Sequence, residues 1–142
     1  MRLSLLTVVV LVACGGAATP PDAPATLTAA DLVGRWRFEV RPVDRDTVLA
    51  TGMLVAAGDP IAFTQQVTGR DAVPVDAAFD GDSLMTTSGP YPSSFRAGVM
   101  VTTTGVIRMA GDTLHGITTA HYDGVAGADS LARFRVSYTR QP

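Results

Sequence analysis

Apolar and polar residues alternate along much of the chain beyond residue 34. Trp36, Phe38 and Val40 are separated from one another by charged residues. A period of two places successive side chains on opposite faces of a strand, so this pattern predicts a half-buried strand with a charged outer face. The same alternation and a β-rich composition predict eight strands in all, at residues 35–41, 47–57, 61–68, 73–79, 83–88, 98–109, 113–122 and 133–139.

Short turn signals separate these runs and indicate how the strands are connected. Glycine, proline and aspartate cluster between them, for example at residues 58–60 and 80–82. Strands joined by short hairpins form an antiparallel meander, and eight of them can close into a barrel without exposed edges. The predicted fold class is therefore all-β, an eight-stranded antiparallel up-and-down barrel. A β-sandwich is the alternative, but the sequence offers no long crossover connection of the Greek-key type.

A short helical turn is expected before the first strand. Thr28 and Asp31 have the spacing of a capping box, in which each residue satisfies a backbone N–H of the first helical turn. Gly34 follows at once and is expected to end the helix after one or two turns.

The N-terminus has the layout of an export signal. Arg2 supplies a positive charge, residues 5–12 form an uncharged and mainly apolar run, and Ala13 is the small residue expected before a cleavage site. A membrane-spanning helix needs about 20 apolar residues, and this run is too short for one. The alternative is a hydrophobic first strand with a buried free cysteine.

Residues 11–14, Leu-Val-Ala-Cys, resemble the lipobox of bacterial lipoproteins. The resemblance implies that residues 1–13 are a lipoprotein signal peptide and that Cys14 carries lipid after cleavage, which would attach the protein to a membrane. Gly15, rather than aspartate, follows the cysteine, and in a Gram-negative cell this implies the outer membrane. The expected localisation is therefore the cell envelope, lipid-anchored and facing the periplasm.

The rest of the chain divides into a linker and one domain. Residues 14–27 combine small residues with three prolines, which is typical of a flexible, fairly extended linker. Residues 28–142 are long enough for a single β-barrel domain with its own core. The domain contains no cysteine, so packing alone must hold it together.

Composition argues against nucleic acids and metals as partners. The formal net charge is −2, and the eleven basic residues, all arginine, form no basic run. His115 and His121 are expected on one strand, roughly 20 Å apart at the strand rise, which is too far to share a metal ion. The aspartates near turns, Asp44, Asp46, Asp80 and Asp82, are expected to be solvated rather than to bind calcium. No metal and no cofactor are predicted.

Residues 31–36 resemble the opening of lipocalin-like (calycin) domains, in which a Gly-x-Trp motif starts the first strand after a helical turn. Here Gly34 and Trp36 supply that motif. The resemblance implies that an arginine near the end of the last strand packs over the tryptophan and closes one end of the barrel. Arg135 or Arg140 is expected in this role, and the predicted closure consists of Gly34, Trp36 and Arg135. Arginine stacked on indole gains cation–π energy of about 0.5–2 kcal/mol.

Residues 81–84, Gly-Asp-Ser-Leu, resemble the signature of a family of serine esterases, and residues 112–115 imitate its downstream Asp-x-x-His. A similar four-residue motif recurs at residues 111–114 and, more loosely, at residues 128–131. A motif repeated at successive hairpins indicates residues that form turns, because glycine supplies positive φ while Asp and Ser or Thr bond the local backbone. No catalytic residues are predicted, and the protein is not expected to be an enzyme.

The longest loop is expected between Ser88 and Ser94, with Phe95 just after it. Loops carry binding residues more often than strands do, so Tyr91 and Phe95 are the candidate portal of a ligand-binding barrel. A small apolar or amphipathic ligand would occupy the interior. The alternative is a filled barrel that acts as an envelope interaction module or enzyme inhibitor. An interior cavity of a few hundred cubic ångströms would favour the ligand.

Overall fold

The computed structural model of the chain describes residues 26–142. The predicted signal peptide, Cys14 and nearly all of the predicted linker lie outside the described residues.

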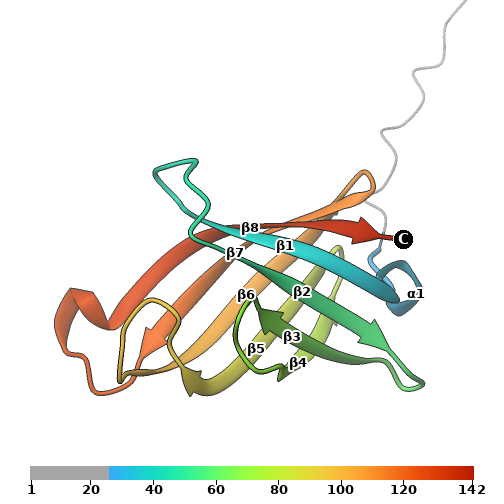
Figure 1. Cartoon of the computed structure of the whole chain (residues 1–142). Coiled ribbons are helices and arrows are strands. Elements are labelled where there is room, and N and C mark those ends of the chain that lie inside the picture. The colour runs from blue at the N-terminus through green and yellow to red at the C-terminus, as the bar shows by residue number, and fades with distance from the viewer. Residues whose placement is uncertain (1–25) are drawn as a thin grey trace, which may run out of the picture.

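The described chain folds into a closed antiparallel barrel of eight strands in sequential order (Figure 1). Strand β1 pairs with β8 as well as with β2, so the sheet has no edge. The up-and-down barrel is confirmed, and the sandwich is excluded. The elements are α1 (Ala29–Leu32), β1 (Gly34–Pro42), β2 (Ala50–Ala57), β3 (Ala62–Val67), β4 (Val73–Asp80), β5 (Ser83–Pro92), β6 (Met100–Ala110), β7 (Thr113–Tyr122), the 3-10 turn η1 (Gly127–Ser130) and β8 (Leu131–Gln141).

Two strand boundaries differ from those predicted by three residues or more. Strand β2 begins only at Ala50, because Val48 and Leu49 are exposed in the turn that precedes it. Strand β5 continues to Pro92, beyond the predicted end at residue 88. Two prolines fit in this stretch because the pairing with β6 shifts register between Ser88 and Tyr91, where the ladder is interrupted.

The core consists of the inward rows that alternation predicts, and it is densest at one end of the barrel. Trp36, Leu84, Ile107 and Leu114 are at most 2% exposed. A separate cluster around Val101, which includes residues of β7 and β8, lies toward the other end. The two ends are therefore filled differently, and this difference positions the candidate site.

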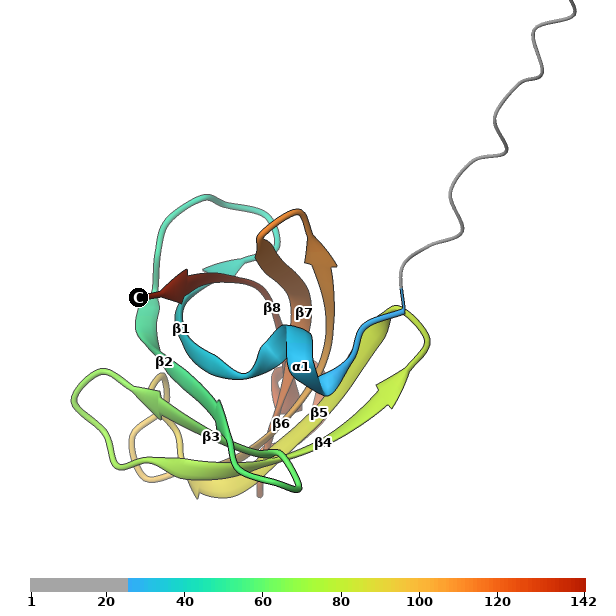
Figure 2. The ribbon, with the colours of Figure 1, turned by 90° about the vertical axis from the view of Figure 1, so that its right-hand side faces the viewer.

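Helix α1 lies across the densely packed end of the barrel (Figure 2). The backbone N–H of Thr28 donates to the Asp31 carboxylate, as the predicted capping box requires, and the Thr28 hydroxyl donates to the same carboxylate. Leu32, the last residue of the helix, is buried. Leu27, assigned to the linker from its sequence, is also buried, and its N–H donates to the Gly81 carbonyl. The folded domain therefore includes Leu27.

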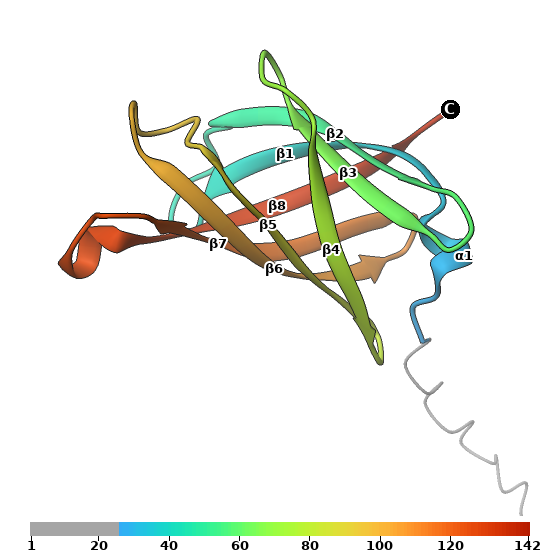
Figure 3. The same ribbon diagram turned by 90° about the horizontal axis from the view of Figure 1, so that it is seen from below.

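The shortest strand pairing lies between β3 and β4. Only residues 63–65 pair there with residues 73–75, whereas β1 and β8 pair over eight positions. The two strands diverge from their connecting turn (Figure 3). Because fewer ladder hydrogen bonds join them, this is the seam at which local opening of the barrel is expected to need the least free energy.

Gly52 allows a close approach between β1 and β2. A Cβ at this position would lie 2.3 Å from Cζ of Phe38 and 2.3 Å from the Gln66 carbonyl oxygen. The Phe38 ring therefore occupies the space that a side chain at position 52 would need. Gly52 is the residue that pairs with Phe38 between the two strands.

Candidate functional site

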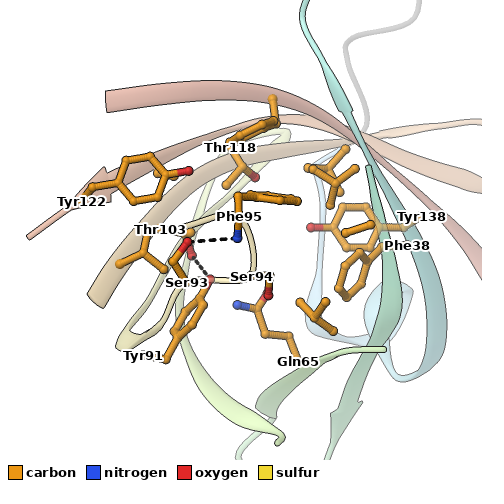
Figure 4. A pocket seen from close by; sticks show the side chains of 17 residues that line it. Phe38, Gln65, Tyr91, Ser93, Ser94, Phe95, Thr103, Thr118, Tyr122 and Tyr138 are labelled. Carbon is orange, nitrogen blue, oxygen red and sulfur yellow. Dashed lines mark hydrogen bonds between the residues drawn. The ribbon is translucent and has the colours of Figure 1, made fainter. Parts of the chain in front are cut away.

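A cavity of about 80 Å³ lies inside the barrel, at the end opposite α1 (Figure 4). Its wall combines aliphatic and aromatic side chains with a few hydroxyls and one amide. It is lined by Phe38, Val40, Ala50, Gln65, Val67, Tyr91, Ser93, Ser94, Phe95, Val101, Thr103, Thr118, Ala120, Tyr122, Phe134, Val136 and Tyr138. None of these side chains is charged, so the wall favours an uncharged or apolar occupant.

The other end of the barrel is closed by Trp36 and Arg140. The indole N–H of Trp36 donates to the Leu32 carbonyl at 2.8 Å. The Arg140 guanidinium lies 4.3 Å from the centroid of the Trp36 ring. It also donates to the carbonyl oxygens of Val33, at 2.7 Å, and Asp31. These contacts connect α1, β1 and β8 and close this end of the barrel.

The predicted role of Arg135 in this closure is wrong. Arg135 faces outward from β8 and lies toward the cavity end, where its guanidinium donates to the Pro42 and Arg45 carbonyls and to the Asp46 carboxylate, the last at 2.8 Å. It ties β8 to the turn between β1 and β2. Of the two arginines expected from the sequence, only Arg140 stacks on Trp36.

Residues 93–99 form a lid over the mouth of the cavity. The buried Ser93 hydroxyl accepts hydrogen bonds from the backbone N–H groups of Phe95, at 3.1 Å, and Arg96, at 3.0 Å. The Ser93 N–H donates to the Val99 carbonyl at 2.8 Å, which closes the loop at its base. Side-chain and backbone bonds of this kind hold a tight turn in one conformation.

Two aromatic contacts fasten this lid to the barrel. The Phe95 ring packs on Phe134 with 5.3 Å between centroids. The Arg96 guanidinium lies 4.1 Å from the centroid of the Tyr122 ring. Phe95 is still 43% exposed, so it covers the mouth without being sealed into the core. Phe95 therefore lines the cavity at its mouth, and its role as a portal stays a prediction.

Tyr91 lines the cavity from strand β5 rather than from a loop. Its hydroxyl pairs with the Thr103 hydroxyl at 3.2 Å. Burial raises the pKa of Tyr91, although hydrogen bonds from neighbouring side chains act in the opposite direction. Tyr91 is therefore part of the barrel wall, while the segment from Ser93 to Val99 covers the mouth of the cavity.

Tyr138 is one of the buried tyrosines of the cavity wall. It is 7% exposed, and its ring packs on Phe38 with 5.8 Å between centroids. Burial raises the pKa of Tyr138 strongly, so the phenol stays protonated at neutral pH. Sequence patterning placed Tyr138 on the apolar face of the last strand, but the environment of its hydroxyl depends on tertiary packing and could not be predicted.

The esterase-like residues do not assemble a catalytic triad. The Ser83 hydroxyl donates to its neighbour Asp82 at 2.7 Å. His115 pairs across β7 and β6 with Arg108, which in turn pairs with Ser83. Two strand spacings therefore separate Ser83 from His115, roughly 10 Å in all, which is beyond hydrogen-bond reach. The Asp82 carboxylate lies 3.4 Å from Arg108 and 2.7 Å from the Ser83 hydroxyl, and the Ser83 bond is the main cause of its lowered pKa.

The two histidines are exposed on strand β7 and contact only threonines. Nε2 of His115 pairs with the Thr113 hydroxyl, and Nε2 of His121 with the Thr104 hydroxyl. Among residues 26–142, no group of three or more His, Cys, Asp or Glu side chains is placed to hold a metal ion.

A shallow groove on the outer surface of the barrel is lined by Arg41, Arg108 and Arg135. Each guanidinium already lies within 3.4 Å of a carboxylate. The partners are Glu39, Asp82 and Asp46, respectively. The groove is therefore internally neutralised and does not present an unpaired anion-binding site.

Comparisons with known protein families, with curated proteins and with solved structures found no match to this chain. Within the part of the chain that the structure describes, no helix is both long and apolar enough to cross a membrane. The features that bear on function are therefore the barrel interior and the sequence of the N-terminus.

Proposed function

We propose that this protein is a lipid-anchored, lipocalin-like barrel of the cell envelope that binds a small apolar or amphipathic ligand. The observation that carries the proposal is the cavity, which is about 80 Å³ in volume and lacks charged side chains in its wall. Its mouth is covered by a lid rather than by a strand or helix, while Trp36 and Arg140 close the opposite end. An apolar pocket with a few convergent polar groups is typical of a small-molecule site.

The membrane attachment rests on the lipobox-like residues 11–14. Cys14 would carry the lipid, and Gly15 favours the outer membrane of a Gram-negative cell, with the barrel in the periplasm. Labelling cells with radioactive palmitate tests this attachment. The wild-type protein should be labelled and the Cys14→Ser variant should not. Equal labelling of the two proteins would refute the lipid anchor.

Ligand binding is tested by native mass spectrometry of the full-length protein after gentle purification from a bacterial host. The wild type should retain a small molecule. The Ala120→Leu variant should lose it, because Ala120 is 3% exposed on the cavity wall and three extra carbon atoms would fill the space. Thr119→Leu is the matched control, since strand alternation points its side chain outward.

The alternative is an envelope interaction module with no small-molecule ligand. It is favoured by the size of the cavity, which is smaller than the roughly 300–1,000 Å³ of ordinary ligand sites. Cross-linking in intact cells should then capture one defined protein with equal yield from the wild type and the Ala120→Leu variant. Absence of bound ligand in the wild type, together with that capture, would replace the first proposal with the second.

A further inference from the structure

At least one buried polar group that faces the cavity has no hydrogen-bond partner within residues 26–142. The Tyr138 hydroxyl makes no hydrogen bond with any residue of the described chain, although the residue is 93% buried. The structure records no fully enclosed side-chain oxygen or nitrogen without a partner among residues 26–142. The hydroxyl must therefore open onto the cavity, and Figure 4 shows it directed inward from the wall.

Two other tyrosines, Tyr91 and Tyr122, line the cavity. The Tyr122 hydroxyl also has no hydrogen bond within the described chain, whereas the Tyr91 hydroxyl has one. The Tyr91 hydroxyl already pairs with Thr103. Leaving a buried hydroxyl unpaired is unfavourable, so the Tyr138 hydroxyl is a group whose hydrogen bond must come from something in the cavity. Because burial raises its pKa, the group remains a phenol at neutral pH and can donate that bond.

The wall also limits the charge of the occupant. No lining residue is an acid, an arginine or a histidine. An ion in this space would lose its hydration without gaining a counter-charge, which is strongly unfavourable. The cation of the lid is Arg96, and its guanidinium lies over the Tyr122 ring rather than in the cavity.

The volume limits the size of the occupant. An apolar cavity of about 150 Å³ in another protein holds benzene. A space of about 80 Å³ is about half that size and therefore takes a smaller group, such as a short branched chain. The aromatic walls formed by Phe38, Phe95 and Phe134 suit such a flat or compact group.

We propose that the cavity binds a small, uncharged ligand through a carbonyl or equivalent acceptor, to which the Tyr138 hydroxyl donates a hydrogen bond. This inference rests on the proposed ligand-binding function and specifies the chemical class of the ligand. It makes Tyr138 the residue that determines specificity, while the aliphatic and aromatic walls supply affinity.

The test uses two probes of nearly the same shape, acetone and 2-methylpropene, which differ in whether oxygen or a CH₂ group is attached to the central carbon. Dissociation constants are measured by NMR titration of the full-length protein. The wild type should prefer the ketone by about fivefold or more, the free energy of one neutral hydrogen bond. Tyr138→Phe should lose this preference and favour the hydrocarbon, because the ketone carbonyl would then be buried without a donor. Tyr91→Phe, whose hydroxyl already has a partner, should keep the preference.

The outcomes separate this inference from the proposed function. Equal affinity of the two probes for the wild type would mean that water satisfies the Tyr138 hydroxyl, and it would overturn the inference while leaving a ligand-binding cavity. A ketone preference that survives Tyr138→Phe would also overturn it. If neither probe perturbs the resonances of cavity residues, both the inference and the proposed function fail. A nuclear Overhauser contact between ketone and Tyr138 in the wild type supports the assignment without relying on any variant.

Discussion

The guanidinium of Arg140 lies 4.3 Å from the centroid of the Trp36 ring, and it joins the end of the last strand to the start of the first. The same group donates to the carbonyl oxygens of Val33 and Asp31, so a single side chain contacts both the aromatic ring and the end of α1. Closure at this end depends on one arginine with a planar, forked set of donors.

Removing that arginine should destabilise the barrel. We expect Arg140→Ala to lower the free energy of unfolding by about 2 kcal/mol, because both the cation–π contact and charge-assisted hydrogen bonds are lost. Arg140→Lys should recover less than half, since an ammonium lacks the planar fork. Urea denaturation monitored by tryptophan fluorescence measures both effects.

Arg135 and Arg133 provide the controls. Arg135→Ala removes an exposed ion pair with Asp46 and should cost at most about 1 kcal/mol. Arg133→Ala, on the outer face, should change stability still less. A loss at Arg140 no larger than the loss at Arg133 would contradict the proposed closure.

Gly52 should be intolerant of even the smallest side chain. Gly52→Ala would place its Cβ 2.3 Å from both the Phe38 ring and the Gln66 carbonyl. Overpacking of this kind costs about 1–3 kcal/mol, and we expect the upper half of that range because one of the clashing atoms is backbone. Thermal unfolding of Gly52→Ala and of Gly52→Ala/Phe38→Leu measures it. The second change should recover part of the loss, and a Gly52→Ala protein as stable as the wild type would refute the steric account.

The lid should loosen when its serine is removed. Ser93→Ala deletes the acceptor for the Phe95 and Arg96 N–H groups. We expect hydrogen exchange of the Arg96 amide to accelerate about fivefold, corresponding to about 1 kcal/mol for one hydrogen bond. Ser94→Ala is the matched control and should leave this exchange rate unchanged. If both variants exchange at the wild-type rate, the Ser93 hydroxyl does not fix the lid.

Acid should weaken the N-terminal cap of α1. The hydrogen bond from the Thr28 hydroxyl, followed by the one from its backbone N–H, lowers the pKa of Asp31, and Arg140 acts in the same direction. A carboxyl whose folded pKa is depressed stabilises the fold above its unfolded value of about 3.9, and this contribution is lost as pH falls through the lower folded value.

Asp31→Asn should accordingly lower the urea midpoint at pH 6 and lower it less at pH 2.5, because the carboxyl of the unfolded chain is protonated there and the contribution of the charged form has decreased. Asp71→Asn, a substitution at an exposed turn position, is the control. An equal decrease at both pH values would show that the effect of Asp31→Asn does not depend on its charge.

Most of the fold could be predicted from sequence because alternation and turn chemistry are local. The capping box of Thr28 and Asp31 is also a local pattern. Choosing between Arg135 and Arg140 required only the parity of the last strand. Arg140 shares the parity of the inward-facing Val136 and Tyr138, whereas Arg135 has the outward parity. The alternation along the last strand therefore distinguishes the two arginines, although both lie near the end of the chain.

The site was less predictable for physical reasons. The prolines of residues 90 and 92 predict a loop, yet the register shift in β5 lets this segment stay in the sheet. The lid begins instead at Ser93, where the Ser-x-x-Arg spacing of the turn gives only a weak local signal. Cavity volume and the unpaired Tyr138 hydroxyl arise from how eight strands pack together, and no pattern along one strand encodes them.

The burial of Leu27 has a consequence for how the proposed anchor and the proposed pocket coexist. Leu27 is fixed at the end of the barrel that carries α1, through its N–H bond to Gly81. The chain therefore leaves the domain at the pole opposite the lid. A tether attached there pulls on the sealed pole only, so a membrane-bound molecule would keep its mouth unobstructed and could exchange ligand with the surrounding aqueous compartment.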